Sequence, residues 1–212
     1  VILRDLAQAY ACVLSNAPWR VAELPMTYAE YAGWQRRWFL ATRLSTELAY
    51  WRRQLHGLEP TMLPTDFPRP PQKSFRGAKI RLDFDPDLKS RLEALAARFD
   101  ASLAIVLLTA LKIVLQRYTS SDDIAVGVPI ANRQHLVAEP LVGTCVNTLV
   151  IRSDLSGDPD FASALARVRE TCLQAYEHQN MPFEMLVKEL QLPRDPSRSA
   201  LFSVMFNMLN TP

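Results

Sequence analysis

Residues 178–202 read HQNMPFEMLVKELQLPRDPSRSALF and combine three polar motifs, HQ, PFE and RDPSRSALF, with a short apolar helix pattern. Pro182 followed by Glu184 is typical of a helix start, because proline fits the first turn and an acidic side chain favours the positive end of the helix dipole. A final strand is predicted over residues 201–209, LFSVMFNML. An ordinary helix and strand need no such run of polar residues, which makes this stretch a candidate signature.

Three further strands are predicted upstream. Residues 79–84, KIRLDF, alternate charged and apolar side chains, which predicts a half-buried strand. IAVGVPI at 124–130 and CVNTLVI at 145–151 are apolar enough for central strands. Helix starts are predicted between and after these strands at Asp85-Pro86, Ser102 and Asp158-Pro159. Strands separated by helices indicate a layered α/β fold.

The chain divides into three parts by composition. Residues 1–58 form a helical entry segment, in which Thr27 and Glu30 make a capping box. Residues 59–77 hold five prolines and are expected to form an extended surface connection. Residues 78–212 contain the predicted α/β core.

Composition excludes several classes of function. The 212 residues are 49% apolar with a formal net charge of +2, so a real core is expected but no basic footprint for nucleic acid or an anionic membrane. The three cysteines have no CxxC spacing and the three histidines no metal spacing, so neither a disulfide framework nor a metal site is predicted. No signal peptide or long apolar stretch is visible, and a reducing cytoplasm fits.

Phosphate-binding and hydrolase motifs are also absent from the sequence. Four motifs in order instead resemble the condensation domains of nonribosomal peptide synthetases. They are YAEYAGWQR at 28–36, VGTCVNTLVIR at 142–152, HQNMPFE at 178–184 and RDPSRSALF at 194–202. Any one motif alone is weak evidence. The intervening VILRDLAQAY at 1–10 and GVPIANR at 127–133 match the family as well, so the resemblance covers essentially the whole chain.

The resemblance implies a two-lobed fold similar to chloramphenicol acetyltransferase, of which residues 1–212 are the C-terminal lobe. Such domains join a donor acyl or peptidyl thioester to the amine of an acceptor aminoacyl thioester, of the type that links two L-configured residues. Both substrates arrive on the phosphopantetheine arms of upstream and downstream peptidyl carrier proteins, through a tunnel between the lobes. The implied partners are these carriers, the N-terminal lobe and an adjacent adenylation domain.

The family's catalytic motif, HHxxxDG, is not in this sequence and is expected just before Val1. The family also continues beyond Pro212 into a latch and a closing strand and helix. The isolated chain is therefore expected to be inactive. Because one lobe alone leaves an apolar tunnel wall uncovered, it is also expected to self-associate.

Asn147 is the best candidate for a site residue, since the resemblance places it in a strand beside the tunnel, near the reacting groups. Its amide can hold a thioester carbonyl or a water, or it can simply be a satisfied buried amide that fixes a strand edge. Ala131 and Asn132 are expected to end a strand that faces the tunnel. Gly143 closes a loop, 133–143, that matches the family's floor loop. The substrate-binding residues that the resemblance implies are Asn147, Ala131, Asn132 and Gly143.

The other motif residues are interpreted as structural. These are the aromatic residues of one helical face, the helix start and a loop ion-pair cluster: Tyr28, Tyr31, Trp34, Pro182, Phe183, Glu184, Arg194, Asp195 and Arg198. His135 is interpreted as a solvated loop residue rather than a catalyst.

Two positions depart from the family pattern. Cys145 stands where the family commonly has a bulky aromatic, so either the local cavity is wider or a neighbouring side chain fills the space. Asn180 stands where Asp is commoner, which removes a charge. The parent protein can also be a homologous module that does not condense but epimerises or recruits a tailoring enzyme; PFE and RDPSRSALF favour condensation.

Overall fold

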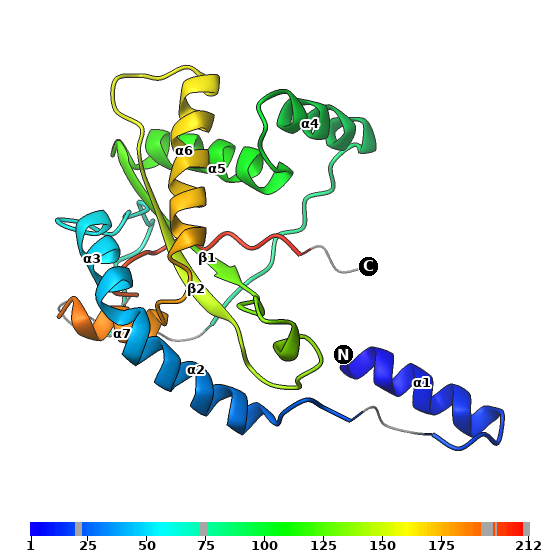
Figure 1. Cartoon of the computed structure of the whole chain (residues 1–212). Helices are drawn as coiled ribbons and strands as arrows, with labels where there is room; N and C mark the ends of the chain where they lie inside the picture. The colour runs from blue at the N-terminus through cyan, green and yellow to red at the C-terminus, as the bar shows by residue number, and fades with distance from the viewer. Residues whose placement is uncertain (20–22, 73–75, 192–196, 198, 210–212) are drawn as a thin grey trace.

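The computed structural model describes residues 1–19, 23–72, 76–191, 197 and 199–209, and the order of their elements is shown in Figure 1. The helices and strands are α1 (Ile2–Leu14), α2 (Tyr28–Thr42), α3 (Leu44–Gln54), α4 (Pro86–Arg98), α5 (Leu103–Thr119), β1 (Asp123–Ile130), a 3-10 turn η1 (Leu136–Ala138), β2 (Asn147–Asp154), α6 (Phe161–Glu177) and α7 (Phe183–Glu189).

The predicted helix starts are confirmed by the caps. Thr27 and Glu30 form the reciprocal capping box at the start of α2. Asp85 caps α4 through the backbone N–H of Asp87, and Ser102 caps α5 through that of Ile105. The start of α6 lies two residues later than the Asp158-Pro159 pair, because Asp160 provides the capping carboxylate.

The centre of the fold is an antiparallel pair of strands, in which β1 runs against β2 with Asp123 opposite Asp154 and Ile130 opposite Asn147. Ile124, Ala125 and Val126 are consecutive and fully buried, so both faces of β1 are covered. Helix α5 packs against β1, α6 packs against β2, and the two helices contact each other. The prediction of a layered α/β core is confirmed.

The predicted final strand over 201–209 is shorter than expected. It pairs with β1 in parallel at one bridge, Gly127 to Met205, through the Gly127 N–H to the Val204 carbonyl (2.9 Å) and the Phe206 N–H to the Gly127 carbonyl (2.8 Å). Gly127 is required there, since a Cβ atom would lie 2.5 Å from the ring of Phe202.

The prediction of a half-buried strand over 79–84 is wrong. The segment forms no strand, and Ile80, Leu82 and Phe84 are 89%, 73% and 74% exposed. The alternating pattern is present, but none of the described residues pairs with its backbone. A period of two predicts a strand only where a neighbouring strand completes the hydrogen bonds.

A buried lysine ties α5 to both strands. Lys112 is fully buried and donates to the carbonyls of Ile124 on β1 (3.0 Å) and Ile151 on β2 (2.7 Å), and to the Ser153 hydroxyl (2.9 Å). Removal from water lowers the pKa of Lys112 to about 7. All three donors of the ammonium group are used, which makes its burial tolerable.

Helix α1 has an amphipathic pattern, yet none of its residues is buried. Leu3, Leu6 and Val13 are 81%, 63% and 74% exposed, and the helix lies away from the strands in Figure 1.

Within the described residues no single helix is long and apolar enough to cross a membrane. Helices α4 and α5 are long and apolar enough for a span only when they are taken together, and the pair is bent by 99°.

Candidate functional site

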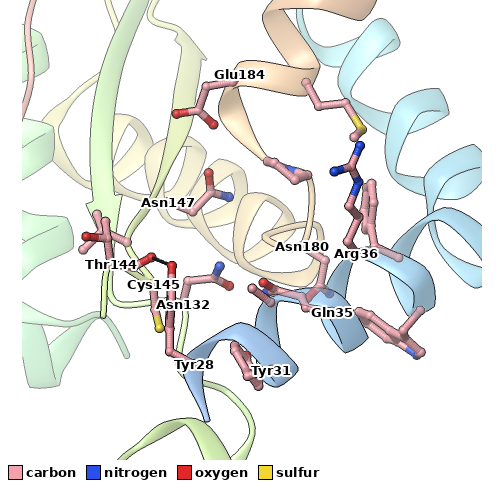
Figure 2. A pocket seen from close by; sticks show the side chains of 16 residues that line it. Tyr28, Tyr31, Gln35, Arg36, Asn132, Thr144, Cys145, Asn147, Asn180 and Glu184 are labelled. Atoms are coloured by element: carbon pink, nitrogen blue, oxygen red, sulfur yellow. Dashed lines mark hydrogen bonds between the residues drawn. The ribbon is translucent and has the colours of Figure 1, made fainter. Parts of the chain in front are cut away.

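A cavity of about 300 Å³ opens between α2, the end of β1, the residues that enter β2 and the start of α7 (Figure 2). Its polar lining includes four side-chain amides and two charged groups, namely Gln35, Asn132, Asn147, Asn180, Arg36 and Glu184. No histidine lines it, and the described residues hold no group of three side chains able to bind a metal. The cavity is therefore equipped to bind and orient polar groups.

Asn147 fixes the junction between β2 and α7. It is 8% exposed, its Nδ2 donates to the carbonyls of Gln179 (3.0 Å) and Met181 (2.8 Å), and its Oδ1 accepts from the backbone N–H of Phe183 (3.0 Å). Both amide hydrogens are thus used within the chain, and a ligand carbonyl would have to displace one of these bonds. The remaining lone pair of Oδ1 is the part of the amide left for a ligand.

Three donors that line the cavity have no partner in the described structure. Gln35 and Arg36 lie on α2, and Asn132 follows β1 with a left-handed backbone (φ 50°) that asparagine tolerates. Asn132 was predicted from the sequence, whereas the two α2 residues were missed. The signal lay in their helical spacing from Tyr28 and Tyr31, which line the same cavity.

Ala131 and Gly143, predicted to contact substrate, do not line the cavity. Ala131 is exposed. Gly143 lies against the ring of Tyr28, where a Cβ atom would come within 2.4 Å of that ring. The Tyr28 hydroxyl donates to the Thr144 carbonyl (2.7 Å), so Gly143 allows α2 to approach the loop.

Loop 133–143 is held by one arginine. The guanidinium of Arg133 donates to the carbonyls of Ala138, Leu141 (2.9 Å) and Gly143 (3.1 Å). Ala138 and Leu141 are buried against Tyr31, which is 2% exposed. The loop therefore packs as a rigid wall against α2.

The aromatic residues of α2 have two different environments. Tyr31 is buried as predicted, whereas Tyr28 is 38% exposed and Trp34 is half-buried. Trp34 stacks on Trp38 (5.8 Å), and the ring of His135 lies edge-on to both tryptophans. His135 is thus held in a ring cluster while it stays partly exposed, and it does not line the cavity.

The PFE motif lies at the start of α7 and also reaches the cavity. Pro182 is the N-cap of α7, and Phe183 packs against Phe202 with ring centroids 5.6 Å apart. The exposed side chain of Glu184 lines the cavity and lies near Asn147 in Figure 2. The predicted cluster of Arg194, Asp195 and Arg198 lies outside the described residues.

A second polar group beside the cavity could not be seen in the sequence, because it joins Glu47 on α3 to His178, which lies 131 positions further along the chain. Glu47 is 2% exposed and lies 3.2 Å from Nδ1 of His178, whose ring stacks on Tyr50 (3.9 Å). Burial raises the pKa of Glu47, while the contact with His178 and a hydrogen bond from the side chain of Asn180 oppose that rise. Asn180 therefore supplies a neutral donor at a position where Asp would place a second carboxylate.

Comparison with known proteins identifies this architecture. The family model described as the condensation domain matches residues 1–212. A linear gramicidin synthase from Brevibacillus parabrevis is 49% identical over 214 residues, which cover 100% of this chain and 4% of that protein. Malpibaldin synthetase from Mortierella alpina is 40% identical over 211 residues, which cover 99% of this chain and 4% of that protein. The chain thus spans a small part of the relatives that it matches.

Solved structures show the same fold. The X-domain from teicoplanin biosynthesis superposes with a TM-score of 0.85 at 30% identity, over 95% of this chain and 46% of that one. The first condensation domain of the CDA synthetase gives a TM-score of 0.76 at 22% identity, over 97% of this chain and 44% of that one. The chain belongs to the condensation domain family and has its chloramphenicol acetyltransferase-like α/β fold.

Proposed function

We propose that this chain is the C-terminal lobe of a nonribosomal peptide synthetase condensation domain that forms an amide bond. In this reaction the amine of a carrier-bound aminoacyl thioester attacks the carbonyl of a carrier-bound donor thioester. The new C–N bond replaces the C–S bond, the donor's pantetheine thiol leaves, and the amine loses a proton. Family membership over all 212 residues carries the proposal.

The cavity supplies the binding part of this reaction. Gln35, Arg36 and Asn132 present unpartnered donors to it, which suits the carbonyl oxygens of thioesters and of a pantetheine arm. Asn147 holds the α7 start in place and offers the free lone pair of Oδ1 to an amine. Among the described residues no histidine lines the cavity, and in our proposal the catalytic base is the histidine motif expected upstream.

The exposed apolar side chains of α1 fit this assignment, since a helix with this pattern ordinarily packs on a partner surface. The N-terminal lobe of the same domain is that partner in our proposal. The carrier proteins and an adenylation domain complete the working assembly in the cytoplasm.

A condensation assay tests the proposal. A longer polypeptide that contains this chain and the upstream lobe, mixed with donor- and acceptor-loaded carrier proteins, is expected to yield the amide product by mass spectrometry. The 212-residue chain alone is expected to give none. Turnover by the isolated chain at the rate of the longer polypeptide would contradict the assignment of catalysis to the upstream lobe.

A second function is favoured by one observation, the likeness to the X-domain from teicoplanin biosynthesis, which has also been solved in complex with OxyB. In that case the parent module recruits a tailoring enzyme and does not condense. Saturable binding of a tailoring oxygenase, together with no amide product from correctly loaded carriers, would favour recruitment. Amide formation without such binding would favour condensation.

A further inference from the structure

The turn between α6 and α7 forms one wall of the cavity and is anchored from two sides. From α3, the indole Nε1 of Trp51 donates to the His178 carbonyl (3.0 Å). From β2, Nδ2 of Asn147 donates to the carbonyls of the two residues that flank Asn180 (3.0 and 2.8 Å). Asn180 itself lines the cavity, as Figure 2 shows. Its side chain is therefore presented from a backbone that is held in place.

A buried carboxylate lies behind this turn. Glu47 is 2% exposed, and three groups lie near it: Nδ1 of His178 at 3.2 Å, the side-chain amide of Asn180 and the guanidinium of Arg43. Burial raises the pKa of Glu47, and all three groups oppose that rise. An ionised carboxylate accepts hydrogen bonds but cannot donate one. Asn180 therefore offers Glu47 its amide nitrogen and not its oxygen.

This polarity decides which end of the Asn180 amide is left for a ligand. The nitrogen is engaged with Glu47, and the oxygen lies on the other arm of the same planar group. No residue of the described chain donates a hydrogen bond to that oxygen. Arg36, which lines the same cavity, can only donate. The cavity thus combines a fixed acceptor with a fixed donor, which suits a ligand that carries both N–H and C=O groups.

We propose that Asn180 is a specificity-determining residue, whose amide oxygen accepts a hydrogen bond from an N–H group of the bound substrate, and that Glu47 is the positioning residue that fixes this orientation. The inference rests on the proposed function, in which such N–H groups belong to the amides of the pantetheine arm and to the amine of the acceptor. It adds a chemical preference that the unpartnered donors of the cavity do not imply. A ligand with an oxygen in place of this N–H would bring two sets of lone pairs together and leave the Asn180 oxygen without a donor.

Replacement of single N–H groups in the ligand tests this preference. Dissociation constants for the 212-residue chain are measured by calorimetry with an aminoacyl-pantetheine thioester, with an analogue that lacks the amine, and with analogues in which an ester oxygen replaces an amide N–H of the arm. One replacement is expected to weaken binding at least about fivefold. If the weak ligand is the compound without the amine, Asn180 binds the attacking nitrogen; if it is an ester, Asn180 binds the arm.

Paired variants assign the effect to Asn180. Glu47→Met/Asn180→Leu replaces both partners by apolar side chains of similar size and is expected to bind the two ligands of the sensitive pair with equal affinity. Glu47→Gln/Asn180→Asp reverses the internal hydrogen bond but keeps an oxygen at the cavity, so the preference is expected to remain. Glu47→Gln alone allows the amide to turn and is expected to reduce the preference.

A control and the contrary outcomes complete the experiment. Gln35→Met removes another lining amide and is expected to leave the ratio of the two dissociation constants unchanged. Equal affinity of the wild type for all ligands, or a preference that persists in Glu47→Met/Asn180→Leu, would overturn the role of Asn180 while the proposed function stands. A preference unchanged in Glu47→Gln would overturn the positioning role of Glu47, even if the apolar pair does not fold. No binding of any ligand would contradict both this inference and the binding role of the cavity.

Discussion

Asn147 at the start of β2 and Leu82 in segment 79–85 each have a burial opposite to the one that their polarity favours. Asn147 is a polar side chain, 8% exposed, whose amide makes three hydrogen bonds that join β2 to α7. Leu82 is an apolar side chain, 73% exposed, in a segment whose backbone pairs with none of the described residues. The comparison teaches that partners decide the structure of each segment. Asn147 is buried because its hydrogen bonds are satisfied, and the segment with alternating apolar side chains stays open because the described part of the chain places no strand beside it.

The largest effect is expected where a buried polar group loses its partners. Asn147→Ala leaves two carbonyls and the Phe183 N–H unpaired at the start of α7, so a loss of about 3 kcal/mol in the free energy of unfolding is expected. Urea denaturation measures it. Gln35→Ala is the control, because Gln35 lines the same cavity without a hydrogen bond, and a change under about 0.5 kcal/mol is expected. Equal losses for the two variants would remove the distinction between them.

The second prediction concerns the carboxylate beside the cavity. Asn180→Asp puts a second negative charge next to buried Glu47, so a loss of about 2 kcal/mol is expected at pH 8. The loss is expected to shrink at pH 5, where the pair can hold a proton. Glu47→Gln/Asn180→Asp exchanges the charged and neutral groups and is expected to recover stability. A double variant as unstable as Asn180→Asp would refute the pairing.

The third prediction follows from Lys112. Because its pKa is about 7 in the folded chain and near 10.4 when unfolded, the unfolded state binds more protons between these values and stability rises with pH. From pH 7 to 8.5 this contributes about 1.5 kcal/mol. Above pH 9 the raised pKa values of Cys172 and Tyr50 act in the opposite direction. Lys112→Met is expected to remove the rise, and an unchanged slope in the variant would assign it to another group.

The smallest effect belongs to the exposed segment. Leu82→Ser is expected to change the free energy of unfolding of the monomer by less than about 0.5 kcal/mol, because the side chain is already in water. Thermal unfolding at low protein concentration measures it. A loss comparable with that of Asn147→Ala would mean that the segment is packed in solution, and the contrast between the two regions would disappear.

Local signals in the sequence predicted most of the helices. The capping box at Thr27, the caps at Asp85 and Ser102 and the proline before α7 each act within a few residues, so they can be seen without tertiary structure. The strand at 79–84 was predicted wrongly because strand formation depends on a neighbour. The predicted final strand pairs with its neighbour β1 at a single bridge.

The candidate site divides in the same way. The motif resemblance led to Asn132 and Asn147, both of which line the cavity. It also suggested Ala131 and Gly143, which do not, since membership of a motif does not distinguish a lining side chain from a packing one. The contact between Glu47 and His178 spans 131 positions and leaves no local pattern to recognise.

The binding role of the cavity is the central claim, and side-chain amide resonances test it most directly. An aminoacyl-pantetheine thioester titrated into the ¹⁵N-labelled chain is expected to shift the amide signals of Gln35 and Asn132 saturably. Ala32→Trp, which fills the cavity from α2, is expected to abolish both shifts. Signals that stay unchanged in the wild type, or that shift equally in the filled variant, would contradict the assignment of this cavity to the thioester substrates.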